Sequence, residues 1–207
     1  INIGAAISGS TTLTIAPRTT STTIALGTSA TGSLKLEDAE LAYLTNGFSS
    51  ITFGSSTATG KITAAAFNYS DYIKLYNYGA SSSGIEFIGA FNTGTDNLTI
   101  YTTGSVTQAA GGSIAAAGLE LLGTGASYAL TNTANAISTL AGNTTTVSYL
   151  QNSNYVIGTV NTVGLTATTL TLSSTQTVTQ SQKLAVTGLE LLGSGTFTLT
   201  NTGSANA

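Results

Sequence analysis

The chain has 207 residues, of which 41% are hydrophobic and only 6% charged, and its formal net charge is −3. It contains neither histidine nor cysteine, which excludes Ser–His–Asp and Cys–His catalytic sets, zinc sites and disulfides. Five basic residues are spread thinly and form no basic patch, so we expect no binding to nucleic acid. Threonine, serine, asparagine and glycine supply the polarity, and this mixture favours strands and turns.

No apolar run approaches the roughly twenty residues of a membrane-spanning helix, so we expect no transmembrane segment. The start, Ile1-Asn2-Ile3-Gly4, has neither a methionine nor the basic region of a secretion signal. At the other end, residues 201–207 repeat residues 132–136 with small insertions and stop where the first copy continues. We therefore expect residues 1–207 to be a single segment excised from a longer chain.

Residues 1–33 are rich in threonine and serine, with short apolar groups and one proline, Pro17, that marks a turn or corner. Residues 36–44 carry the only helical pattern. Leu36, Leu41 and Leu44 fall roughly on one face, acidic residues lie near the start, and Asn46-Gly47 follows. We expect a helix of one to two turns that crosses a corner of the fold.

Short strand patterns then recur at spacings of about 19 to 28 residues, each flanked by glycine, asparagine or serine. One series comprises residues 51–53, 73–76, 98–100, 119–121, 147–149, 170–172 and 189–191. Weaker patterns between them cover residues 61–63, 85–88, 128–130 and 155–157. Apolar residues alternate with threonine, glutamate or lysine, as in strands with one buried face.

The strongest signal is an internal repeat. The segment Gly118–Gly125, GLELLGTG, returns seventy residues later as Gly188–Gly195, GLELLGSG. The copies cover roughly residues 104–173 and 176–207, and the second is truncated. Such self-similarity is typical of solenoids, and three strands in a coil of about 22 residues predict an all-β, right-handed parallel β-helix of about nine coils. In this interpretation Glu120 and Glu190 hold equivalent, outward positions three layers apart.

The order of several motifs resembles the repeat region of filamentous-haemagglutinin-like exoproteins. The resemblance covers roughly residues 33–207 and is carried by residues 36–41 (LEDAEL), 104–112 (GSVTQAAGG), 130–135 (LTNTAN) with 140–141, and 155–160 (YVIGTV). These proteins are large secreted or surface-tethered adhesins of Gram-negative bacteria, often exported by two-partner secretion. The resemblance implies a right-handed β-helical rod on the cell surface or outside the cell.

Candidate binding residues are few. Tyr69, Tyr72, Tyr76 and Tyr78 form an aromatic cluster, and an exposed aromatic strip can contact a sugar or a protein. The alternative is that these rings pack on a coil surface or under a loop. The asparagines of three N-x-S/T sequons can accept glycan in a secreted protein: Asn68, Asn97 and Asn143.

The acidic cluster of Glu37, Asp38 and Glu40 at the helix start favours a capping role over acid–base chemistry. Glu120 and Glu190, about 14 Å apart at three interlayer spacings, are too distant to form a catalytic pair. Glycine-rich pieces such as Gly123–Gly125 lack the residues of a phosphate-binding loop. We therefore predict no catalytic, cofactor-binding or metal residues.

The sequence predicts a non-enzymatic structural protein, a shaft or spacer segment of a large secreted or surface-exposed bacterial adhesin. Its partners would be neighbouring coils of the parent chain. One alternative is an extracellular filament subunit that stacks end to end with another copy. A further alternative is a carbohydrate-binding β-helix that recognises a host or surface glycan, or a protein, through its tyrosines. An ice-binding face is disfavoured because coil lengths vary and charged residues interrupt the threonine pattern.

Overall fold

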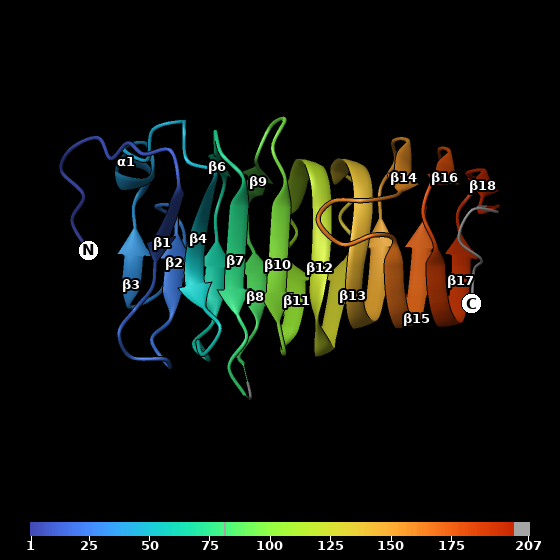
Figure 1. Ribbon diagram of the computed structural model, residues 1–207, viewed down its shortest axis with the longest axis horizontal. Coiled ribbons are helices and arrows are strands. Elements are labelled where there is room, and N and C mark those ends of the chain that lie inside the picture. The colour runs from blue at the N-terminus through green and yellow to red at the C-terminus, as the bar shows by residue number, and fades with distance from the viewer. Residues whose placement is uncertain (81, 201–207) are drawn as a thin grey trace.

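A computed structural model, which describes residues 1–80 and 82–200, shows strands that wind around one long axis, with the N-terminus at one end (Figure 1). The chain is nearly all β, and its parallel strands form a β-solenoid of about seven turns. Among the described residues the strands β1 to β18 pair in parallel, and each pairing joins one turn to its neighbour, as expected for a parallel β-helix. The predicted fold class is therefore confirmed.

The wall has three sides. The first side is formed by β1 (Thr12–Ile15), β4 (Ser50–Ser55), β7 (Ile73–Asn77) and β10 (Leu98–Thr102), followed by parts of four longer strands. These are β12 (Ser113–Leu130), β13 (Ala136–Leu150), β15 (Leu165–Ser173) and β17 (Leu184–Leu192), which turn corners without a break.

The second side begins with β3 (Leu34–Leu36), β2 (Ile24–Leu26), β5 (Ile62–Ala64), β8 (Ile85–Phe87) and β11 (Ser105–Gln108). The C-terminal parts of the four long strands continue it. The third side holds β6 (Phe67–Asn68), β9 (Ala90–Asn92), the starts of β12 and β13, β14 (Tyr155–Ile157), β16 (Val178–Gln180) and β18 (Phe197–Thr198).

The interior is built from columns of apolar side chains in register. Leu98, Leu119 and Leu140 stack on the first side, each fully buried, and the main core cluster runs from Ile3 to Leu184. Glycine permits a tight corner at Gly123, where φ is +128° and an added Cβ would collide with the Thr102 carbonyl of the layer below. The core is therefore one continuous apolar column enclosed by hydrogen-bonded layers.

Buried amides complete the corners, which the sequence patterns left as plain turns. The side chain of Asn135 accepts the Ile114 N–H at 3.0 Å and donates to the carbonyls of Leu130 and Leu150. Gln151, fully buried, accepts the Ile137 N–H and donates to the Ile137 carbonyl. These amides satisfy backbone groups that the turns would otherwise leave unpaired.

A short cap covers part of the N-terminal end. Strand β3 pairs with the outer edge of β2 and leads into α1 (Asp38–Leu41), whose Leu41 is buried. The Glu40 carboxylate accepts the N–H groups of Glu37 and Ile3, and these bonds lower its pKa. The predicted helix exists, but it is one turn at the end of the solenoid. Because β3 and α1 are a detour between β1 and its partner β4, this part of the chain adds fewer layers than its length suggests, and about seven turns form where nine were expected.

The two copies of the repeat do not occupy the same side, and here the prediction was wrong. Leu119 pairs with Leu98 and Leu140 on the first side, whereas Leu189 pairs with Leu170 on the second. Three successive pairings lead from Leu121 through Gly142 and Leu165 to Leu184, and the repeat copy of Leu121 lies beyond that point, on the next side. The strands at residues 147–149 and 170–172 likewise continue the second side, with residues 128–130.

Candidate functional site

The outward surface of the first side carries three of the four predicted tyrosines. Along β7, inward and outward residues alternate, which turns Tyr76, and Tyr72 and Tyr78 beside it, away from the core. Tyr69 instead lies in the core, in edge contact with Phe53 and Phe67, so its ring is not available at the surface. Burial raises the pKa of its hydroxyl.

The outward tyrosines are joined by one that the sequence reading did not single out. Tyr101 on β10 lies in register with Tyr76, stacks on Tyr78 with ring centres 3.9 Å apart, and meets the Tyr76 ring edge-on at 5.3 Å. Aligning the two strand patterns could have found Tyr101, because a parallel register that places Ile73 beside Leu98 also places Tyr76 beside Tyr101. We call Tyr76, Tyr78 and Tyr101 the aromatic ledge.

A shallow groove of about 150 Å³ runs beside the aromatic ledge. It is lined by Tyr78, Tyr101, Leu122, Gly123, Thr124 and Asn143. This lining combines two tyrosine rings and an apolar side chain with an amide and a hydroxyl group, and it can contact a ligand that has both apolar and hydrogen-bonding surfaces. Asn143 in this groove is also an exposed sequon asparagine.

Tyr72 belongs to a different group on the same surface. Its hydroxyl pairs with the Thr99 hydroxyl and accepts from the side-chain amide of Asn161, each at 2.5 Å, while the Lys74 ammonium lies 4.9 Å from its ring centre. Burial, assisted by the negative charge of Glu120, raises the pKa of this tyrosine. Its polar end is therefore already engaged within the protein.

Glu120, predicted to point into solvent, is only 2% exposed. It accepts hydrogen bonds from the Thr99 hydroxyl at 2.6 Å, the Asn161 amide at 3.0 Å and the backbone N–H of Thr162 at 2.6 Å. Burial opposes ionisation, but these donors hold the pKa of the carboxyl below its usual value. The covering loop comes from residues 158–164, and strand patterns gave no sign that it would return to this point. Glu190 is exposed, as expected.

The remaining sites lie apart from this surface. Asn68 is exposed, and its side-chain oxygen accepts from the side-chain amide of Asn92, while Asn97 is half-buried. In the part of the chain that the structure describes, no group of three or more His, Cys, Asp or Glu residues is arranged to hold a metal ion. Nor does any helix among these residues have the length and apolarity needed to cross a membrane.

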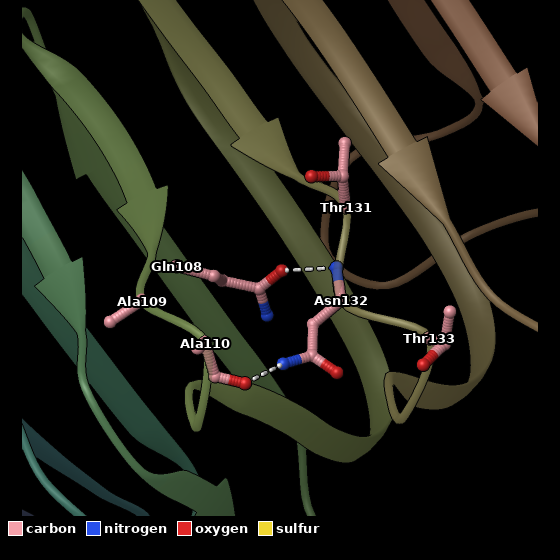
Figure 2. A pocket seen from close by; sticks show the side chains of 6 residues that line it. All are labelled: Gln108, Ala109, Ala110, Thr131, Asn132 and Thr133. Atoms are coloured by element: carbon pink, nitrogen blue, oxygen red, sulfur yellow. Dashed lines mark hydrogen bonds between the residues drawn. The ribbon is translucent and has the colours of Figure 1, made fainter.

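A second hollow, of about 310 Å³, lies where the turns after β11 and β12 stack (Figure 2). Gln108 accepts the backbone N–H of Asn132 at 3.0 Å, and the Asn132 amide donates to the Ala110 carbonyl at 3.2 Å. Figure 2 shows both bonds bridging the two turns. The polar groups thus hold adjacent layers together, which is a structural role.

The chain is therefore a parallel β-solenoid that carries the aromatic ledge on the outward surface of its first side. Comparison of the chain with protein-family models, with curated proteins and with solved structures found no match in any of the three.

Proposed function

We propose that this chain is a non-catalytic structural segment, part of the β-helical shaft of a large secreted or surface-exposed protein. The observation that carries the proposal is the unbroken core, in which columns such as Leu98, Leu119 and Leu140 continue from layer to layer inside parallel ladders. Solenoids of this kind grow by adding layers, and their hydrogen bonds run along the axis, which makes them stiff spacers. The resemblance of the repeat motifs to filamentous-haemagglutinin-like exoproteins supports a place outside the cell.

Stiffness can be measured directly because the chain has no native cysteine. Cysteines introduced at exposed Thr11 and Ser194, near opposite ends of the described solenoid, would carry a donor and an acceptor dye. A shaft gives one narrow distance distribution that does not change with salt. A matched chain with a Gly/Ser linker in place of residues 98–140 should give a broad distribution. A broad distribution in the unmodified protein would contradict the shaft.

A second candidate is assembly with another copy, favoured by the last described layer. Leu189, Leu191 and Leu192 are 44%, 41% and 43% exposed, and among residues 1–80 and 82–200 no strand pairs with the outer edge of β17. Such an edge can receive another coil, from the same chain or from a second copy.

Because β3 and α1 cover part of the N-terminal end, a second copy fits best by joining two β17 edges. Sedimentation should then show a dimer that Leu191→Lys abolishes; under the shaft proposal both forms stay monomeric.

A third candidate is glycan binding at the aromatic ledge, favoured by the groove lined by Tyr78, Tyr101 and Asn143. Tyrosine faces stack on sugar rings while amides bond their hydroxyls. Titration with soluble oligosaccharides of neutral hexoses should show saturable binding that Tyr101→Ala removes. Tyr43→Ala, at an exposed tyrosine elsewhere, is the control. Binding that survives Tyr101→Ala, or no binding, contradicts this role.

A further inference from the structure

Residues 158–164, here called the strap, form a closed loop between β14 and β15. The N–H of Gly164 donates to the carbonyl of Gly158 at 2.8 Å, so the loop leaves and re-enters the wall at one point. Inside it, Thr159 and Val163 form a single antiparallel bridge. The end residues Gly158 and Gly164 still bond β13, through the Leu140 carbonyl and the Gly142 N–H, but residues 159–163 lie outside the parallel ladders and can reach elsewhere.

The strap reaches back along the axis. In Figure 1 the orange chain after β14 swings across β13 toward β12 before it returns to β15. Its Thr162 N–H and Asn161 amide bond Glu120 on β12, and the same Asn161 amide donates to the Tyr72 hydroxyl beside β7, 89 residues earlier in the sequence. On the first side β13, β12 and β10 separate β15 from β7, so these contacts skip layers.

The surface under the strap is shaped to receive it. A Cβ added at Gly118 would lie 2.8 Å from a methyl of Val160 and 2.6 Å from the Asn97 amide oxygen, so only glycine leaves room there. Thr99 joins the two anchor points, because its hydroxyl contacts both Glu120 and Tyr72. The anchor is therefore a connected polar network on three neighbouring strands, with Glu120 as its acceptor.

We propose that the strap is a brace across layers, fastened by the ionised Glu120 carboxylate, and that it is released when this carboxylate is neutralised. In a solenoid each layer ordinarily contacts only its neighbours, so layers can open separately. The brace links the layer of β15 to those of β12, β10 and β7. This proposal concerns the chain's own layers and does not rest on a role as a shaft.

The release should follow acidification. The strap contains no titratable residue. The groups that face Glu120 come from three strands. Lys74 and Tyr76 lie on β7, Tyr72 directly precedes it, and Tyr101 lies on β10. On β13 the residue in register with Glu120 is Ala141, which carries no charge. The tyrosines stay neutral in acid, so Glu120 is the carboxylate of this group that gains a proton as the pH falls. Because folding lowers its pKa below the ordinary 4.5, its contribution is complete above that value and is lost as pH falls through the lowered folded pKa.

Amide hydrogen exchange by NMR tests the brace at one atom, the N–H of Thr162. Protection, expressed relative to the unstructured peptide rate at each pH, should fall about tenfold or more as the pH is lowered from 6 through the folded pKa of Glu120, since a hydrogen bond to a charged group is lost. Glu120→Gln should remove this pH dependence, because a glutamine side chain does not titrate. This holds even if the Asn161 amide rotates to pair with the new side chain. Leu119, in the ladder of β12, reports whether the wall itself stays folded.

Glu190→Gln is the matched control, because Glu190 belongs to the same motif but is exposed, and its carboxylate accepts from the Thr171 hydroxyl at 3.0 Å at the surface. It should leave Thr162 unchanged. Asn161→Ala, at an exposed strap position that cannot disturb the core, should lower Thr162 protection with Leu119 unaffected. The proposal is overturned if Thr162 is unprotected at neutral pH, or if its protection is indifferent to both acid and Glu120→Gln.

Discussion

The segments Gly118–Gly125 and Gly188–Gly195 differ at one residue, Thr124 against Ser194, yet the molecule uses them differently. In the first copy Leu119 and Leu121 are fully buried and Glu120 is covered by the strap. In the second copy Leu191 is 41% exposed and the glutamate faces solvent. A motif therefore specifies a strand and its alternation, while its place in the winding decides what each side chain contacts.

The difference follows from lengths. Three turns of the wall, from Leu121 to Leu184, are shorter than the period of the repeat, so a duplicated block moves on by one side. The side it reaches must still offer an inward column for its leucines, and the second side does so with Leu170 and Leu172. Such a duplication is tolerated because every side buries apolar residues at alternate positions.

The largest expected contrast lies in the leucines. Leu121→Ala removes a fully buried side chain that has a neighbouring layer above and below it, and should lower the free energy of unfolding by about 2–5 kcal/mol. Leu191→Ala, on the last described layer, should cost less than about 1 kcal/mol in the isolated chain. Urea denaturation followed by circular dichroism measures both. Equal losses would mean that the edge of β17 is covered in solution.

The aromatic residues that follow the motifs form the next pair. Tyr128 is buried and its hydroxyl donates to the Ile100 and Leu122 carbonyls at 3.0 and 2.7 Å, whereas its repeat partner is Phe197, half-buried on β18. Tyr128→Phe should destabilise the fold by about 2 kcal/mol because buried carbonyls lose their donor. Phe197→Tyr should change stability by less than about 0.5 kcal/mol. Thermal unfolding of both variants decides the point.

The sequence predicted the architecture because the fold depends on patterns that repeat. Short alternating strands at nearly constant spacing specify parallel layers, and the patterns at residues 73–76, 98–100 and 119–121 do lie in one column of the first side. The switch of sides between residues 121 and 147 was missed, since every side carries the same alternation. The side on which a strand lies depends on the number of residues in all the preceding turns of the solenoid.

The surface was less predictable than the core. Parallel register brought Tyr101 beside Tyr76, which follows once the layers are aligned. The strap did not follow, because residues 158–164 read as one more glycine-flanked turn and their partners Glu120 and Tyr72 lie several layers away. Tyr69 was placed with the surface aromatics, but it lies where β6 and β9 enclose an aromatic group in the core.

The next comparison is between the first glycines of the two motifs, since only the one at position 118 lies under the strap. At Gly118 an added methyl would press on Val160, whereas at Gly188 the nearest heavy atom outside its chain neighbours is the Thr168 carbonyl, 3.9 Å away. Gly118→Ala should therefore cost about 1–3 kcal/mol and displace the strap. Gly188→Ala should be neutral or stabilising by up to about 1 kcal/mol, since it restricts the unfolded chain. Chemical denaturation gives the stabilities, and the Thr162 amide reports the strap.

The smallest contrast concerns the threonines that face the two glutamates. Thr99 is 2% exposed and bonds both Glu120 and Tyr72, while Thr171 makes a bond of 3.0 Å to Glu190 at the surface. Thr99→Val keeps the shape but removes one donor from a buried carboxylate, and should cost about 1–2 kcal/mol at neutral pH. This loss should shrink in acid, because protonated Glu120 needs fewer donors. Thr171→Val should cost less than about 0.5 kcal/mol at any pH, since water replaces the lost bond. Denaturation of both variants at pH 7 and at the acid pH where the Thr162 amide loses its protection tests this; a Thr99 effect that is the same at both values would show that the Glu120 charge does not hold this network together.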